Sequence, residues 1–72
     1  MAEVPIFSVV ALLDDIPEQG LSRGQVGTVV EGLGPGLYEV EFSDDSGQTY
    51  ASLALRSDQL MTLHYEPSRH AA

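Results

Sequence analysis

The chain has 72 residues, of which 11 are aspartate or glutamate and three are arginine; lysine is absent and the formal net charge is −8. This length is sufficient for one small domain, and the absence of cysteine excludes disulfide bonds and thiolate metal ligands. The acidic balance argues against nucleic-acid binding, because proteins normally contact phosphate backbones through several lysines or arginines.

Neither a secretion leader nor a membrane span is predicted. The apolar run at 6–13 is not preceded by lysine or arginine, as a leader would be. No segment approaches the roughly 20 apolar residues that cross a bilayer. We therefore expect a cytoplasmic protein without membrane contact, organised as a lead-in at 1–4, one domain at 5–64 and a disordered tail at 65–72.

The first strand is predicted at 6–13, where the residues are β-branched or aromatic and show no helical period. A polar connection follows at 14–24, and Pro17 ends strand pairing there. Ile16 and Leu21 are the only large apolar residues of this connection. We expect them to fold back onto the domain and anchor the loop.

The second strand, predicted at 25–32, begins within the stretch Arg-Gly-Gln-Val-Gly-Thr-Val-Val-Glu at 23–31. Its glycines, Gly24 and Gly27, are compatible with a phosphate-binding loop or with a sharp turn into a curved strand. A phosphate loop needs a Lys-Ser/Thr pair and a following helix, whereas β-branched residues follow here. We therefore expect Gly24 to turn the chain and Gly27 to permit a bend or a close backbone approach within the strand.

The third strand is predicted at 37–42, after a Gly/Pro turn at 33–36. Its side chains alternate between apolar and acidic types, which is typical of a strand with one packed and one solvated face. The apolar face consists of Tyr38, Val40 and Phe42, and the acidic face consists of Glu39 and Glu41.

A turn at 44–47 leads to the fourth strand, predicted at 48–55. The large side chains of this strand fit no single alternating face unless it has a bulge or bend near Ser52. A 3-10 turn at 57–59 and a short last strand at 60–64 complete the predicted elements.

Five short strands with these connections favour an all-β fold, a five-stranded SH3-like barrel at 5–64 with one 3-10 turn before the last strand. Closure of the barrel would remove exposed sheet edges. The predicted core consists of Val9, Ala11, Leu13, Val26, Val30, Tyr38, Val40, Phe42, Leu53, Leu55, Leu60 and Leu63.

Three segments carry a resemblance to a known family: VALLDDIPEQGLSRGQVGTVVE, YEVEF and GQTYASLALRSDQL. Over about residues 8–64 the chain closely resembles a bacterial family of short proteins catalogued as domain of unknown function 4926. The resemblance implies an SH3-like fold and supplies no catalytic residue and no cofactor. The segment RGQVGTVV is also similar, more distantly, to the β-turn-β signature of small ribosomal and transcription-factor domains that bind RNA or protein.

The candidate protein-contact residues are Glu31, Glu39, Glu41, Asp44, Asp45 and Tyr50. Catalytic carboxylates would need an apolar pocket to raise their pKa, so we interpret the glutamates either as a solvated face or as an acidic docking patch. The four-residue turn that holds the two aspartates is too short for a calcium loop. His64 and His70 lack a third ligand, and we expect neither a metal nor a cofactor.

The leading hypothesis is a non-enzymatic acidic interaction module, such as an antitoxin-like, inhibitory or accessory subunit, that docks a protein with a basic surface. One alternative is a nucleic-acid-binding module of the ribosomal SH3-like type. Another is a small accessory barrel subunit of an enzyme. A catalytic role would need a deep pocket, which an isolated chain of this size rarely encloses. The sequence leaves a homo-oligomer open.

Overall fold

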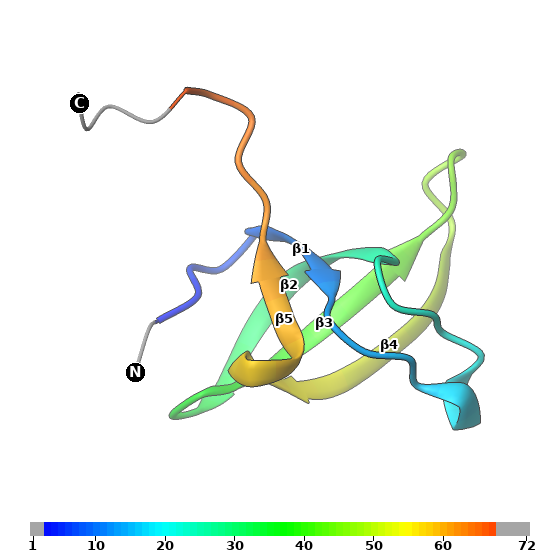
Figure 1. Cartoon of the computed structure of the whole chain (residues 1–72), viewed down its shortest axis with the longest axis horizontal. Helices are drawn as coiled ribbons and strands as arrows, with labels where there is room; N and C mark the ends of the chain where they lie inside the picture. The colour runs from blue at the N-terminus through cyan, green and yellow to red at the C-terminus, as the bar shows by residue number, and fades with distance from the viewer. Residues whose placement is uncertain (1–2, 68–72) are drawn as a thin grey trace.

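Five antiparallel strands form one curved sheet (Figure 1). The computed structural model describes residues 3–67. The elements are β1 (Val9–Leu12), η1 (Pro17–Gln19), β2 (Val26–Gly34), β3 (Leu37–Ser43), β4 (Thr49–Arg56), η2 (Ser57–Gln59) and β5 (Leu60–Thr62), where η denotes a 3-10 turn. The order of the strands is β4-β3-β2-β1-β5. The all-β class, the five strands and the 3-10 turn before the last strand are confirmed, and the arrangement is compatible with a small barrel.

The central part of the core comes from β3, as the alternation of its sequence predicts. Tyr38, Val40 and Phe42 are buried, and the last two are fully inaccessible to solvent. Strands β2 and β4 pair with the two edges of β3, so β3 is an interior strand of the sheet. The hydroxyl of Tyr38 accepts a hydrogen bond of 3.0 Å from the backbone N–H of Val4, which ties part of the lead-in to the core.

The predicted faces of β1 and β2 are wrong by one residue. Val10, Leu12 and Val29 are buried, whereas Leu13 and Val26 are exposed. Val9 and Val30 of the predicted core are only half-buried. Both strands carry apolar residues on their two faces, so their composition does not fix the register, and a one-residue slip exchanges the faces.

Of the other residues predicted to lie in the core, some are buried as expected and some are only half-buried. Ala11, Leu55 and Leu60 are buried as expected. Leu53 on β4 and Leu63, which follows β5, are half-buried. The described strands contain no pairing between β4 and β5, so the sheet keeps two edges that a fully closed barrel would lack.

The bulge of the β3–β4 ladder lies at Tyr50 rather than near Ser52. Phe42 pairs with Ala51 and Ser43 pairs with Thr49, so Tyr50 is the extra residue on β4. After the bulge, Leu53 and Leu55 pair with the buried Val40 and Tyr38 in regular register, so they share the inner face and no bend is needed near Ser52. The predicted position of the irregularity was therefore two residues too late.

The long connection between β1 and β2 is held by its two apolar residues, as expected. Ile16 and Leu21 are buried, and each donates its backbone N–H to the other's carbonyl oxygen, at 2.8 and 3.1 Å. Between them the 3-10 turn η1 ends at Gly20, whose φ of +70° is in the left-handed region. This second 3-10 turn was not expected from the sequence.

Strands β1 and β5 are shorter than predicted. Strand β1 begins at Val9 rather than at residue 6, and β5 ends at Thr62 rather than at residue 64. Phe7 precedes β1 with a φ of +71°, and its backbone N–H donates to the carbonyl oxygen of Val29 at 2.6 Å. Of the predicted lead-in and tail, residues 1–2 and 68–72 lie outside the described residues.

Candidate functional site

The structure brings three of the six predicted contact residues onto one surface. Glu31 on β2 pairs with Glu39 on β3, and Glu41 lies two residues further along β3. Glu39 and Glu41 alternate with the buried residues of β3, and Glu31 lies directly opposite Glu39, so all three lie on the outer side of the sheet. We call the outer surface of β2, β3 and β4 around Glu31, Glu39 and Glu41 the acidic face.

A bulge at Val30 determines that Glu31 belongs to the acidic face. Val29 pairs with Val40, and the next pair is Glu31 with Glu39, so Val30 is an extra residue. In a regular strand, Val29 and Glu31 would share a face because side chains repeat every two residues. Since Val29 is fully buried, a regular strand would direct Glu31 into the core. The bulge turns it to solvent.

The acidic face has no basic side chain that neutralises it within the described residues. The single ion pair among residues 3–67 joins Arg56 to Asp58. The hydroxyl of Ser52, on the neighbouring strand β4, donates a hydrogen bond of 2.7 Å to Oε2 of Glu39. Two glutamates in direct cross-strand register repel each other, and a single hydroxyl donor leaves that charge uncompensated.

Asp44 acts within the fold of the β3–β4 turn. Its Oδ1 accepts hydrogen bonds from the backbone N–H of Gln48 at 2.9 Å and from the N–H and hydroxyl of Ser46 at 3.0 and 2.8 Å. The bond from Gln48, followed by that from the Ser46 hydroxyl, holds the pKa of Asp44 below its ordinary value. This is the turn chemistry expected from the sequence, whereas Asp45 is exposed beside it.

Tyr50 is hydrogen-bonded to Gln25, the residue that precedes β2. Its hydroxyl accepts a hydrogen bond of 2.7 Å from Nε2 of Gln25, and about half of its surface is exposed. The predicted contact residues therefore divide into the three glutamates of the acidic face and three residues at the β3–β4 hairpin, which projects from the sheet in Figure 1.

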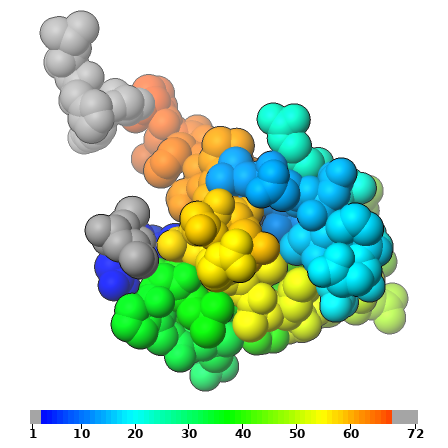
Figure 2. Space-filling view, turned by 60° about the horizontal axis from the view of Figure 1, so that its bottom comes forward, coloured from blue at the N-terminus to red at the C-terminus, as the bar shows by residue number. Residues whose placement is uncertain are grey.

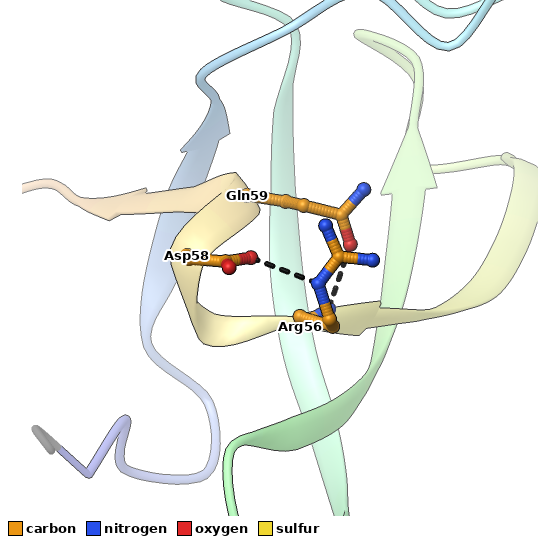
Figure 3. Close-up of polar contacts among 3 residues, drawn as sticks. All are labelled: Arg56, Asp58 and Gln59. Carbon is orange, nitrogen blue, oxygen red and sulfur yellow. Dashed lines mark hydrogen bonds and ion pairs between the residues drawn. The ribbon is translucent and has the colours of Figure 1, made fainter.

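Sequence reasoning missed a group of polar residues at the end of β4. Nε of Arg56 donates to Oδ1 of Asp58 at 3.0 Å, and the backbone N–H of Arg56 donates to Oε1 of Gln59 at 2.8 Å (Figure 3). Gln59 is three residues after Arg56, the residue that precedes η2, which is the spacing of the glutamine in a capping box. Because arginine stands where the motif has serine or threonine, only the glutamine of this signal was visible in the sequence.

The same segment borders a shallow depression. It is lined by Pro35, Gly36, Leu37, Arg56, Ser57 and Asp58, and Figure 2 shows the green β2–β3 turn close to the yellow residues of η2 on this side of the molecule. Enzyme pockets bury most of their ligand, whereas this depression is open. Among the described residues no charged side chain is buried, so no carboxylate here lies in the apolar environment that raises the pKa of a general acid.

The comparison with protein families decides how the chain is classified. A family model described as "Domain of unknown function (DUF4926)" matches residues 6–62. The chain belongs to this family. The resemblance found in the sequence is thereby confirmed. No curated protein and no solved structure matches the chain.

The matched DUF4926 segment contains all five strands and every candidate contact residue. It ends at Thr62, the last residue of β5. Within residues 3–67, the DUF4926 structure has no helix with the length and apolar character that crossing a membrane would require. The acidic face is thus part of the family domain rather than of a flanking segment.

Proposed function

We propose that this DUF4926 domain is a non-enzymatic interaction module whose acidic face docks a basic surface of a cytoplasmic protein. In this role it would be an antitoxin-like, inhibitory or accessory subunit. The observation that supports the proposal is the direct pairing of Glu31 with Glu39 on a surface where no described lysine, arginine or histidine forms an ion pair with either.

Electrostatic repulsion between these glutamates favours a basic partner. Like charges directly opposite each other on neighbouring strands destabilise a sheet, by an amount comparable to the roughly 0.2–1 kcal/mol of a favourable cross-strand pair. A lysine or arginine of the partner that lies between the two carboxylates converts this repulsion into two attractions. Among the described residues no cation forms an ion pair with either glutamate, so we expect the partner to supply it.

The net charge of −8 supports the same partner chemistry. A strongly acidic molecule accelerates its encounter with basic surfaces. Interactions between exposed charges are screened over about 10 Å at 0.1 M salt, so the association rate is expected to fall steeply as salt is added. The same charge opposes association with a phosphate backbone.

The experiment compares two variants that lose the same number of charges. Glu31→Gln/Glu39→Gln/Glu41→Gln neutralises the acidic face, and the control replaces exposed carboxylates elsewhere: Glu3→Gln, Asp14→Asn and Glu18→Gln. Each protein is immobilised and incubated with native lysate at low and at high salt, and the captured proteins are identified.

The expected result is capture of a basic protein by the wild type and by the control at low salt, with loss at high salt and with the acidic-face variant. Capture of nothing at either salt concentration, or equal capture by both triple variants, would contradict the proposal. A gel-shift assay with RNA at low salt is expected to give no retarded band.

A further inference from the structure

The outer edge of β4 is an unpaired strand edge. Strand β4 lies at the end of the sheet, and within residues 3–67 it pairs only with β3. Edge strands present free backbone N–H and C=O groups to any further strand that can align with them. Between Thr49 and Leu55 this edge has no charged residue and no proline, which are the usual means by which natural proteins keep other strands from pairing there.

The hydrogen-bond pattern identifies the residues whose backbone groups point outward. Ser57 donates its N–H to the carbonyl oxygen of Gly36 at 2.9 Å, in the same register that pairs Glu39 with Ala54 and Glu41 with Ser52. Bonded and non-bonded pairs alternate in an antiparallel ladder, so Ser52 and Ala54 belong to non-bonded pairs. Their N–H and C=O groups face away from β3, and no described residue accepts from or donates to them there.

This free edge has defined ends. At its N-terminal end the bulge at Tyr50 interrupts the ladder. At its C-terminal end the side chain of Gln59 accepts a hydrogen bond of 2.8 Å from the backbone N–H of Arg56 (Figure 3), so this N–H is not available to an added strand. The free length is therefore about that of a short peptide strand, centred on Ser52 and Ala54.

Side chains around the edge determine which segment would fit it. On the outer side of β4, Ser52 and Ala54 are small and exposed. They pair with Glu41 and Glu39 of β3, so β4 is the one strand between these carboxylates and an added strand. Neighbouring strands are about 4.8 Å apart, and the four-carbon stem of lysine can cross one strand to reach these carboxylates. Ser52 also draws the carboxylate of Glu39 toward the edge through its hydrogen bond.

On the inner side, the edge is apolar. Ala51 and Leu53 pack against the core and are only partly buried. An added strand would cover them with every second side chain. The matching segment therefore alternates basic residues, which face Glu39 and Glu41, with apolar residues, which face Ala51 and Leu53.

We infer that β4 accepts an extended segment of the partner protein as a sixth, antiparallel strand, in which lysine or arginine alternates with apolar residues. This inference rests on the proposed docking of a basic partner and specifies the partner's segment. Addition of a peptide to a sheet edge is an established mode of recognition. A second copy of this chain fits the edge less well, because each copy carries a net charge of −8 and would bring its own acidic face.

The first test uses three blocked heptapeptides of alternating lysine and valine, with binding measured by fluorescence anisotropy. One is unmodified, one is N-methylated on its lysines and one is N-methylated on its valines. In the antiparallel arrangement the lysines lie opposite Ser52 and Ala54, so their N–H groups face β4. Lysine methylation is expected to weaken binding about tenfold or more, whereas valine methylation, with identical charge, changes it little.

The second test uses protein variants whose folding is verified by thermal unfolding. Ala54→Pro removes the outward N–H at a position that an edge strand tolerates, and Ala54→Lys places a cation opposite the incoming lysine. Both are expected to weaken binding of the unmodified peptide at least about tenfold. Gln19→Lys, which adds the same charge on η1, serves as the control for Ala54→Lys.

The outcomes distinguish the edge from the acidic face alone. Equal binding of all three peptides that is lost when Glu39 and Glu41 are changed to glutamine would overturn strand addition and leave the proposed docking intact. Absence of peptide binding above that of a neutral serine–valine peptide would contradict both. Sedimentation that shows the free protein dimerising, with dimerisation abolished by Ala54→Pro, would assign the edge to a second copy and overturn the inference.

Discussion

The phenyl ring of Phe42 occupies the space that a side chain on Gly27 would need. A Cβ at Gly27 would lie 2.9 Å from Cδ2 and Cε2 of Phe42 and from the backbone oxygen of Glu41. Gly27 is buried, so the ring packs directly against the backbone of β2. The expected close backbone approach at this glycine is thereby confirmed.

Gly27→Ala is expected to destabilise the domain by about 1–3 kcal/mol, as overpacking of a filled core typically does. The backbone oxygen of Glu41 cannot move aside as a flexible side chain can. Urea unfolding measures the effect. Gly32→Ala, where no atom lies within 4 Å of the new Cβ, is the matched control and is expected to stay within about 0.5 kcal/mol of the wild type.

A reduction in the size of Phe42 should make room for alanine at position 27. Phe42→Leu leaves a cavity and is expected to destabilise the domain by about 1–3 kcal/mol. In that background Gly27→Ala should cost less than it does in the wild type, with a coupling of at least about 0.5 kcal/mol. A double-mutant cycle in urea measures the coupling, and strict additivity would contradict the proposed contact.

The sequence predicts which side chains of a strand face the core where that strand has one apolar and one polar face. Strand β3 alternates between Tyr38, Val40 and Phe42 and the two glutamates, and its faces were predicted correctly. Strands β1 and β2 carry valines on both faces, and Gly27 occupies an inward position without a side chain that would reveal it. Periodicity alone could not detect that the ring of Phe42 substitutes for that side chain.

The candidate site was predictable in composition but not in geometry. Glu39 and Glu41 share a face because they are two residues apart on one strand. The direct pairing of Glu31 with Glu39 depends on the bulge at Val30, which no local sequence signal specifies. The free edge at Ser52 and Ala54 depends on strand order, a long-range property.

Glu31→Gln is expected to stabilise the free domain, because it removes the repulsion across the β2–β3 ladder. The gain should be about 0.2–1 kcal/mol at low salt and should decrease as salt screens exposed charges. Thermal unfolding at two salt concentrations measures it. Glu3→Gln, which removes one negative charge from an exposed position as Glu31→Gln does, should show no such gain; equal effects of both variants would refute a specific repulsion.

Acidification is expected to weaken the β3–β4 turn through Asp44. Hydrogen bonds, first from Gln48 and then from Ser46, lower the pKa of this carboxyl in the folded state. The folded state therefore binds the proton less readily than the unfolded chain. The stabilisation is complete above the ordinary pKa of about 3.9 and is lost as the pH falls through the lower folded value.

Urea unfolding of the wild type and of Asp44→Asn across a pH series tests this expectation. The variant should be less stable than the wild type at neutral pH, and the difference should shrink below about pH 4. Asp45→Asn removes the same charge from the neighbouring position and controls for net charge. A difference that stays constant down to the lowest pH would show that the carboxylate of Asp44 does not stabilise the turn.

Gln59→Ala is expected to lower the free energy of unfolding by about 0.5–1.5 kcal/mol, because the backbone N–H of Arg56 loses its acceptor. Asp58→Asn breaks only the ion pair with Arg56, whose two side chains are 65% and 72% exposed, and should change stability by less than about 1 kcal/mol. Urea unfolding compares the two. A larger effect of Asp58→Asn would show that the ion pair, rather than the glutamine, secures η2.

The extra residue at Val30 bears on how this domain tolerates changes in chain length. Removal of Val30 would leave Val29 opposite Val40 and Glu31 opposite Glu39 as consecutive pairs of an uninterrupted ladder. A chain one codon shorter at this point could therefore keep the same inward and outward assignments on both sides of the deletion. Deletion of Val29 would instead place Val30 opposite Val40 in the core, and deletion of Glu31 would place Val30 opposite Glu39 on the acidic face.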